Sequence, residues 1–538
     1  MIASGTKRPR NVDWTRAAAI LYGDWGTSKA YVVGLAFAVA GYASFWLIAS
    51  MCLLTALVGV NYMTICKHYP DGGGVYASVR HRSEIISIVG AFLLIADYIV
   101  TAAISALSAF QYLLPPGSAL AAHPEYFAAA AILLIGALNI LGPKHSGGLA
   151  FLVSVPTAAV VVILGGFCLP HIGEAVHNIT PLTGGFGKNW TGFVSVVLAL
   201  SGVEAIANAT GVMKLDPGST DDKPCVSKTA NKAIIIVMLE VCIFTALLGF
   251  GMHALQGLQI VPSSDGNDVN APGSDGVRDY MLRYMAQIFV GGSLGSWAGY
   301  IAAWTVSIVF GFLLLSAVNT AIVDLIAISF LMSRDGELPP VFNRLNKFGV
   351  PNAGIVIATV IPLVLVLAVK DMGGLAELYA VGVVGAIATN LGASSTDKHL
   401  GLAKWERILM FCTFLVMLSI EVTLLCTKPN ALRFSLIVLT LGLIGRGLAF
   451  EAAQRKKRAE DAAAAAVAAG LQAAKAPMNA FNVHLGAATG GPPLLAAVRG
   501  IGRTLDFALE EAKDSNRPLY LLFVREQPVL APGDRKRK

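Results

Sequence analysis

Charged residues are scarce in this chain. Of its 538 residues, 14% are Asp, Glu, Lys or Arg, whereas soluble domains carry about a quarter. Hydrophobic residues account for 55% of the chain, and the mean hydropathy is +0.66. Apolar runs long enough to cross a bilayer, which takes about 20 residues, recur through the first 450 positions. The composition excludes an ordinary soluble protein and indicates a polytopic membrane protein in a lipid bilayer.

Cysteine is also scarce, and its spacing is uninformative. The seven cysteines stand at positions 52, 66, 168, 225, 242, 412 and 426, without a C-x-x-C pair. Neither a zinc site nor a disulfide framework is predicted, and the thiols are expected to pack as small hydrophobic groups. We also find no phosphate-binding glycine cluster in the C-terminal tail. We therefore expect no enzyme activity, no required cofactor and no nucleic-acid partner.

Apolar runs predict twelve membrane spans, with the segment 257–292 as an outer loop. With the N-terminus in the cytoplasm, the inner loops hold fourteen Lys or Arg residues and the outer loops hold six. This asymmetry favours a multi-pass protein of the cell membrane with both termini cytoplasmic. The predicted spans lie near residues 18–38, 43–65, 84–113, 126–141, 149–169, 191–213, 233–256, 295–330, 353–369, 374–394, 406–426 and 431–449.

The last ninety residues have a different composition. After a transport domain at 1–450, residues 451–477 form a basic and alanine-rich stretch that we predict to be a helical linker. Its basic start suits anionic lipid headgroups. Residues 478–538 are predicted to form a small cytoplasmic βαβ domain. Its expected elements are a strand at Ala480–Ala487, an amphipathic helix at Pro492–Lys513 and a strand at Pro518–Val524.

Three acidic residues lie inside apolar runs: Asp24, Asp97 and Glu204. A charged side chain at the centre of a membrane helix costs about 2.5–3.5 kcal/mol on insertion scales. One such acid can be a neutral carboxyl held by a neighbouring helix, but three are hard to retain for packing alone. Because burial favours the uncharged form, Glu204 or Asp97 is a candidate for carrying a coupled proton. The residues do not rank these two.

Two spans are predicted to be broken helices. Gly23–Ser28 and Ser201–Glu204 each mix glycine, hydroxyl and acid, and they lie five spans apart. Breaks at matching positions of two inverted halves indicate a transporter site near the bilayer midplane. Oxygen ligands there favour a hard cation. Asp97, Thr101 and Ser105 share one helix face because they are four residues apart. Tyr31 and Tyr379 are further candidate ligands, although a lone tyrosine more often only packs.

Five segments resemble a known transporter family. Tyr22–Tyr31 resembles the YGDIGTSPLY signature of KUP-type potassium transporters. Tyr69–Tyr76 resembles the P-x-GGG-x-Y loop of the wider amino acid–polyamine–organocation (APC) superfamily. Asp97–Thr101, Ser201–Asn208 and Leu378–Val383 are similar to the matching segments of KUP/KimA-type potassium importers. The resemblance covers about residues 15–450, and the five segments together are far more specific than the glycine loop.

The resemblance implies an all-α membrane fold with twelve transmembrane helices. These would form an inverted 5+5 repeat (LeuT-like) plus two helices, with a small α/β cytoplasmic tail. It implies proton-coupled potassium uptake by symport. The tail resembles part of a universal-stress-like domain, which implies a homodimer and a possible regulatory site for cyclic di-AMP. The potassium ligands implied by the family motifs are Asp24, Tyr31, Asp97, Tyr98, Thr101, Ser105, Ser201, Glu204 and Tyr379.

Two features depart from that family. Lys29 stands where the signature usually has proline or a neutral residue. It could occupy a cation site, pair with a buried acid or face the outer vestibule. We favour the vestibule or a gate pair. The tail is short, so a nucleotide site there would be incomplete.

Two other functions remain open. The first is a proton-coupled amino acid or amine permease of the same superfamily. A substrate carboxylate would bind at the exposed amides of the broken first helix, where Asp24 would repel it. The second is a sensor that acts through the tail, which is the weakest of the three readings.

Overall fold

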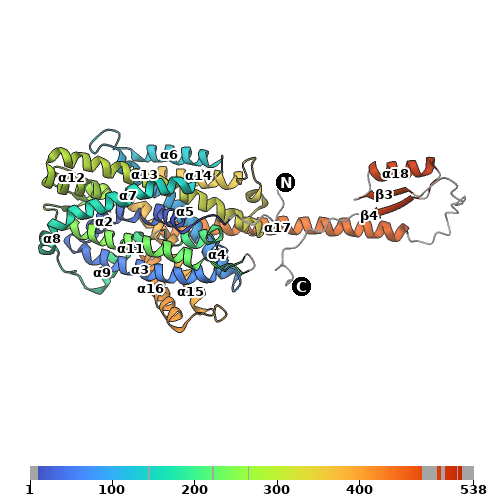
Figure 1. Cartoon of the computed structure of the whole chain (residues 1–538), viewed down its shortest axis with the longest axis horizontal. Coiled ribbons are helices and arrows are strands. Elements are labelled where there is room, and N and C mark those ends of the chain that lie inside the picture. Colours follow the sequence, from blue (N-terminus) through green and yellow to red (C-terminus); the bar gives the residue numbers. More distant parts are fainter. Residues whose placement is uncertain are drawn as a thin grey trace. The chain divides into compact units, whose positions relative to one another are not determined.

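The computed structural model describes residues 10–142, 146–200, 202–220, 223–263, 266–474, 494–498, 503–515, 517 and 519–523. Contacts divide the chain into two units, one of residues 8–453 and one that contains residues 454–538. The first unit is a bundle of helices that run alongside one another (Figure 1). The second contains a short helix and two strands.

The apolar runs fold into helices, as expected. Within the described residues, nine helical segments are long and apolar enough to cross a bilayer. The number twelve stays a prediction, because Trp14–His68 counts as one run and Pro124–Asn139 is shorter than a usual span. The helices of the first unit are α1 (Trp14–Trp25), α2 (Ser28–Ala40), α3 (Ser44–His68), α4 (Gly74–Arg80), α5 (Glu84–Leu113), α6 (Pro124–Asn139), α7 (Ser146–Cys168), α8 (Ile172–Asn178), α9 (Gly185–Ser195), α10 (Ala205–Ala209), α11 (Ser227–Met252), α12 (Met281–Leu294), α13 (Ser296–Arg334), α14 (Asn352–Val369), α15 (Met372–Thr396), α16 (Lys404–Thr427) and α17 (Pro429–Ala474), which runs on beyond residue 453.

Helix 1, the pair α1 and α2, is interrupted where the sequence predicts a break. α1 ends at Trp25, the N–H of Gly26 caps it by donating to the carbonyl of Tyr22, and α2 begins at Ser28. Gly26 and Thr27 therefore separate two helical halves within one span. The carbonyl and amide groups released at such a gap are available to a ligand.

The sixth predicted span, which we call helix 6, is also discontinuous. It consists of α9, a 3-10 turn at Val197–Leu200, α10 and a second 3-10 turn at Thr210–Val212. Gly202 lies between the pieces with φ +92°, and a Cβ there would come within 2.5 Å of the Trp25 amide nitrogen. Only glycine fits this position, since a side chain would be strained and would overlap backbone. The two breaks are therefore in direct backbone contact.

The glycine loop between α3 and α4 packs against helix 6. A Cβ on Gly72 would lie 2.8 Å from the backbone carbonyl oxygen of Asn208. A Cβ on Gly74 would overlap the side-chain amide oxygen of Asn208. A Cβ on Gly211 would come within 2.4 Å of the carbonyl oxygen of Asp71, so it would overlap backbone as well. The loop therefore holds the end of α10 through close backbone contact.

α5 lies at the centre of the bundle and packs along α13 and α15. It is buried along most of its length. α11 packs along α3 and α1. Polar residues in the middle of α5, such as Asp97, Thr101 and Ser105, are therefore buried, as a site between helices requires.

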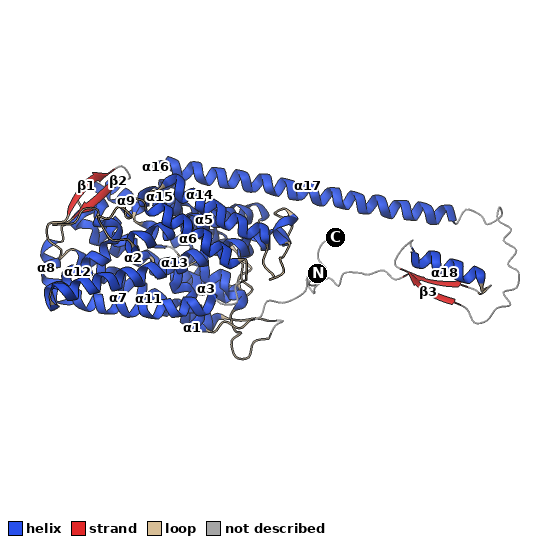
Figure 2. Ribbon diagram, turned by 90° about the horizontal axis from the view of Figure 1, so that it is seen from above, coloured by secondary structure: helices blue, strands red, loops and turns tan. Residues whose placement is uncertain are grey.

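The segment 257–292, predicted as a loop, contains regular structure. β1 (Gln259–Ser263) and β2 (Gly266–Asn270) form an antiparallel hairpin, visible in red at one end of the bundle (Figure 2), and a 3-10 turn at Val277–Tyr280 leads into α12. The Asn267 side chain donates to the carbonyl of Ala38 at 3.1 Å, which ties the hairpin to the end of α2. The prediction missed α12 because its apolar face is too short to be recognised as a span.

The described part of the second unit contains a βαβ piece, whose first described strand lies where the sequence predicts helix. β3 (Leu494–Val498) pairs in parallel with β4 (Leu519–Phe523), and α18 (Arg503–Asp514) connects them. The predicted helix Pro492–Lys513 is therefore wrong over Leu494–Val498, because a short apolar run is compatible with either structure. The predicted strand Ala480–Ala487 lies outside the described residues.

Candidate functional site

Three buried carboxylates meet at the helix breaks. Asp24 lies in the last turn of α1, Asp97 lies midway along α5, and Glu204 directly precedes α10. Their exposed fractions are 2%, 0% and 4%. Asp97 lies close enough to Glu204 and Asp24 for the three charges to act on one another. We call Asp24, Asp97 and Glu204 the acid cluster.

The predicted polar face of α5 borders this cluster. The Thr101 hydroxyl donates to the Asp97 carbonyl at 2.9 Å and lies 3.4 Å from Asp97 Oδ1. Ser105, one turn further on, is 1% exposed. α15 approaches closely, since a Cβ on Gly382 would lie 2.8 Å from the Asp97 amide nitrogen. The contact holds Asp97 against α15, which also carries Tyr379.

Two tyrosines surround the cluster in different ways. The Tyr31 hydroxyl lies 3.2 Å from Thr27 Oγ1, and Thr27 in turn donates to the Asp24 carbonyl at 2.5 Å. Tyr379 is 1% exposed and lies within electrostatic reach of all three acids. Its hydroxyl has no hydrogen-bond partner among the described residues. Tyr379 therefore lies beside the acids, whereas Tyr31 is linked to Asp24 through the Thr27 hydroxyl.

The structure describes one of the two remaining predicted ligands, Tyr98, and does not describe the other, Ser201. Tyr98 also lies within electrostatic reach of the acid cluster, but its hydroxyl accepts a hydrogen bond from the Asn208 side chain. That bond connects α5 to α10 and occupies part of the hydroxyl's capacity. Ser201 lies outside the described residues.

Unpartnered oxygens mark the cluster chemically. In the part of the chain that the structure describes, Oδ2 of Asp97 and both carboxylate oxygens of Glu204 are buried without a hydrogen-bond donor. Burying a carboxylate without a partner is strongly unfavourable unless it is neutralised by a cation or a proton. The arrangement is therefore suited to binding one of these.

The acids do not form a transition-metal site. Among the residues that the structure describes, no group of three His, Cys, Asp or Glu side chains could hold a metal ion. A bound alkali ion would instead draw on a mixed set of carboxylate, hydroxyl and carbonyl oxygens. Such a set is what α5 and the two breaks provide.

Lys29 does not face an open vestibule. Its side chain is fully buried, and Nζ lies 2.8 Å and 2.9 Å from the two carboxylate oxygens of Glu240 on α11. Of the three roles considered from sequence, the geometry favours pairing with an acid. The partner is Glu240, which is not one of the three acids (Asp24, Asp97 and Glu204) identified from the sequence.

Several residues near the site are not among the predicted ligands. Tyr62 on α3 and Asp324 on α13 lie within electrostatic reach of the acid cluster. Glu240 on α11 and Glu421 on α16 are acids inside apolar runs, and the Oε2 atom of Glu421 is buried without a donor in the described chain. The signal for both glutamates was the same as for Asp24, so they could have been found.

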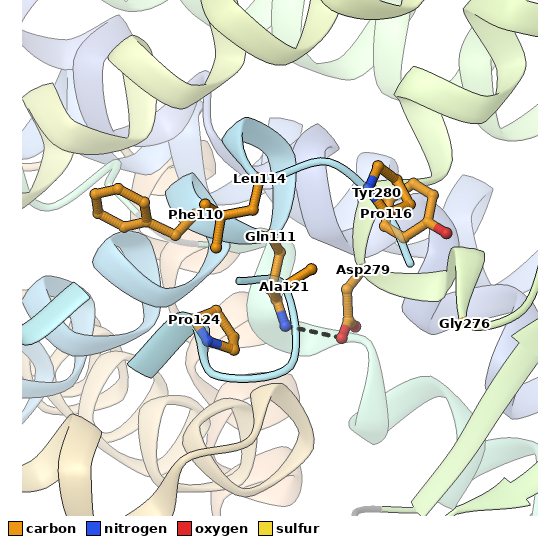
Figure 3. Close-up of a pocket in the computed structure, with 9 residues that line it drawn as sticks. All are labelled: Phe110, Gln111, Leu114, Pro116, Ala121, Pro124, Gly276, Asp279 and Tyr280. Atoms are coloured by element: carbon orange, nitrogen blue, oxygen red, sulfur yellow. Dashed lines mark hydrogen bonds between the residues drawn. The ribbon is translucent and has the colours of Figure 1, made fainter. Parts of the chain in front are cut away.

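One surface pocket lies apart from this site. It has a volume of about 160 Å³, is formed near the end of α5, and is drawn in Figure 3. Gln111 donates across it to Asp279 at 2.8 Å, and Asp279 also pairs with Arg278 at 2.7 Å. None of the predicted ion ligands lines this pocket. The pocket is therefore separate from the acid cluster.

Comparison with known proteins agrees with the geometry. The profile of the family described as Amino acid permease matches residues 12–471. The chain is 27% identical over 388 residues to the potassium transporter KimA of Bacillus subtilis (strain 168), which covers 68% of this chain and 58% of that protein. It is 30% identical over 214 residues to the probable potassium transport system protein Kup 1 of Bradyrhizobium sp. (strain BTAi1), which covers 35% of each chain. The resemblance to KUP/KimA-type transporters is thereby confirmed, although the chain spans 58% or less of the length of these relatives.

Proposed function

The chain belongs to the amino acid permease family, and we propose that within it the protein is a secondary active transporter for proton-coupled potassium uptake across the cell membrane. The observation that carries this proposal is the convergence of Asp24, Asp97 and Glu204 at two touching helix breaks. Relatives named as potassium transporters support it. A site with excess negative charge and oxygen ligands favours a cation over an anion or a zwitterion.

Potassium would bind between helix 1, α5 and helix 6. Asp24, Asp97 and Glu204 would supply the charge, and Tyr31, Thr101 and the other hydroxyl-bearing residues would replace part of the hydration shell. The gaps in helices 1 and 6 would add carbonyl oxygens. Several weak oxygen ligands hold an ion firmly enough to select it and loosely enough to release it.

The proton would be carried by Asp97 or Glu204. Two buried carboxyl groups that repel each other favour a state in which one of them holds a proton. Potassium binding and protonation of one carboxyl group would each remove one negative charge from the acid cluster during transport. A site with less net charge is buried in a low-dielectric environment at lower cost than a more highly charged one. This links the two ions energetically.

We propose that the tail regulates transport. We place both termini in the cytoplasm and propose a homodimer formed through the βαβ unit of residues 494–523. Cyclic di-AMP is the proposed regulator. Equilibrium binding of radiolabelled cyclic di-AMP to the full-length protein tests this. Absence of saturable binding would remove the nucleotide from the proposal and would leave transport untouched.

Uptake of radioactive rubidium into proteoliposomes tests the transport function. We expect saturable uptake that unlabelled potassium inhibits, that an inward proton gradient accelerates, and that a protonophore abolishes. The alternative is a proton-coupled amino acid or amine permease, which the family profile favours. Proton-driven uptake of a labelled amino acid mixture or a polyamine, without saturable rubidium uptake, would establish that alternative instead.

A further inference from the structure

One carboxylate contacts both halves of the broken first helix. Tyr22 in α1 donates its hydroxyl to Glu240 Oε1 at 2.9 Å. Lys29 in α2 donates from Nζ to Oε1 at 2.9 Å and to Oε2 at 2.8 Å. Tyr22 precedes the break at Gly26 and Thr27, and Lys29 follows it. Glu240 on α11 therefore bridges the gap from outside.

The pair is buried and closely surrounded. The side chain of Lys29 is 0% exposed and that of Glu240 is 15% exposed. Lys29 Nζ also lies 3.5 Å from the Tyr22 hydroxyl and 5.0 Å from the centre of its ring, over which a cation is attracted. Hydroxyl, ring and carboxylate together replace the water that an ammonium group loses on burial. The charge of Lys29 is thus compensated where it lies.

The bridge lies a few residues from the proposed ion ligands. Asp24 stands between Tyr22 and the break, and Tyr31 follows Lys29 by two residues. A shift of either helical half would move one of these ligands. An ammonium released from Glu240 would also compete with a transported cation, because both are attracted to the same carboxylates.

We propose that Glu240 is a positioning residue that clamps the two halves of helix 1 and neutralises Lys29, which leaves the acid cluster for the transported cation. This inference rests on the proposed cation uptake. It assigns to Glu240 an effect on ion affinity without contact with the ion. A merely structural ion pair would affect protein stability or yield and would leave the KM for the cation unchanged.

The kinetic test compares Glu240→Gln, Lys29→Met and the double variant in rubidium uptake. Glu240→Gln preserves the shape but leaves Lys29 without a charged partner, and breaking a buried pair in this way is expected to raise the KM for rubidium by about tenfold or more. The double variant removes both charges and should return the KM to within about threefold of the wild-type value, because replacing both members of a buried pair is often nearly neutral. Lys29→Met alone should fall between these two.

Lys428→Met is the matched control for this series. Lys428 pairs with Glu377 at 2.5 Å and joins α16 to α15, but both side chains are partly exposed. Loss of such a pair is worth little, so the KM should change by less than about twofold. A wild-type KM in Glu240→Gln overturns the proposal. So does a double variant that is as impaired as Glu240→Gln.

A second measurement does not depend on the identity of the substrate. Hydrogen exchange of the full-length protein, followed by mass spectrometry, should show faster exchange of residues 22–31 in Glu240→Gln and unchanged exchange in the middle of α5. If the wild-type protein takes up no rubidium, the proposed function fails and the exchange result alone decides on the clamp. Unchanged exchange at residues 22–31 would then overturn it.

Discussion

Two groups of buried charge lie near the break in helix 1, and they are balanced differently. The acid cluster brings together Asp24, Asp97 and Glu204, and in the described chain three carboxylate oxygens of the latter two have no hydrogen-bond donor. On another side of the break, Glu240 meets the ammonium group of Lys29 at 2.8 Å. The first group has excess negative charge, whereas the second compensates itself.

The difference shows that burial of a charged residue does not by itself identify an ion site. Lys29 and Asp97 are equally buried. What separates them is whether the charge is satisfied by the protein. A satisfied pair holds the helices in place, and an unsatisfied carboxyl is available to a mobile cation or a proton. The following predictions test this division.

The largest effect is expected from Asp97→Asn. Because the amide removes charge at the centre of the acid cluster without changing its size, rubidium uptake should fall by about a hundredfold or more, as removal of a buried charge contact permits. The control is Ser108→Ala on the same helix, a buried residue whose hydroxyl contacts the sulfur of Met372 at 3.3 Å. Normal uptake by Asp97→Asn at normal protein level would contradict the distinction between compensated and uncompensated buried charges.

The next effect concerns the contact that brings the two broken helices together. Gly202→Ala should destabilise the protein by about 1–3 kcal/mol, because the added methyl group overlaps backbone and the residue is strained. Gly218→Ala separates the two causes. Gly218 has φ +90°, close to the +92° of Gly202, but nothing lies within 4 Å of a Cβ there. Melting temperatures in detergent provide the measurement, and equal losses in the two variants would refute the role of the contact.

A smaller effect is expected from Glu421→Gln. This glutamate is half-buried on α16, and its carboxylate lies against Gly385 of α15, where an added Cβ would be 3.1 Å from Oε1. It belongs to neither group. Since it is not a proposed ion ligand, we expect the KM for rubidium to change by less than about threefold, which corresponds to about 0.7 kcal/mol. A loss as large as that of Asp97→Asn would mean that the site extends to α16.

The smallest effect lies at the start of helix 1, far from its break. Asp13 caps α1 by accepting from the Arg16 amide at 3.0 Å, so Asp13→Ala should cost about 1 kcal/mol of stability. That bond, and then the one from the Thr15 hydroxyl, lowers the pKa of Asp13. Because the pKa of Asp13 is lower in the folded state, its ionised carboxylate stabilises the fold. This stabilisation is complete above the pKa of the unfolded state, about 4, and is lost as the pH falls through the pKa of the folded state.

The melting temperature measured against pH checks this last prediction. The difference between wild type and Asp13→Ala should be constant near neutral pH and should shrink in acid. The KM for rubidium should stay at the wild-type value. A raised KM would show that the start of α1 influences the proposed ion site. The contrast between the acid cluster and the Lys29–Glu240 pair would then not account for the effect.

The sequence indicates the helices and the acid cluster better than it indicates which distant residues contact them. Breaks and buried acids are local signals, so Gly23–Ser28 and the acid cluster could be identified from residue type and position. The pairing of Lys29 with Glu240 joins residues 211 positions apart. No periodicity encodes such a contact, because it depends on how α11 packs against helix 1. The hairpin of β1 and β2 was likewise hidden inside a polar segment.

Lys29 and Glu240 each carry a local signal in the sequence. Glu240 lies within an apolar run as clearly as Asp24 does. A lysine and a glutamate in separate apolar runs are expected to find each other, since each alone is costly in a membrane. What the sequence could not provide is the geometry, in which one carboxylate also reaches Tyr22.

The close fit of the glycine loop against helix 6 has a consequence for inhibition. Gly72 and Gly74 leave no space beside Asn208, which also donates to Tyr98 on α5. The loop, α10 and the centre of α5 therefore form one continuous line of contact between an end of the bundle and the acid cluster. For the proposed potassium uptake, a nanobody or small molecule that separates the loop from Asn208 should inhibit non-competitively with respect to the cation. Such a ligand would act without occupying the proposed ion site.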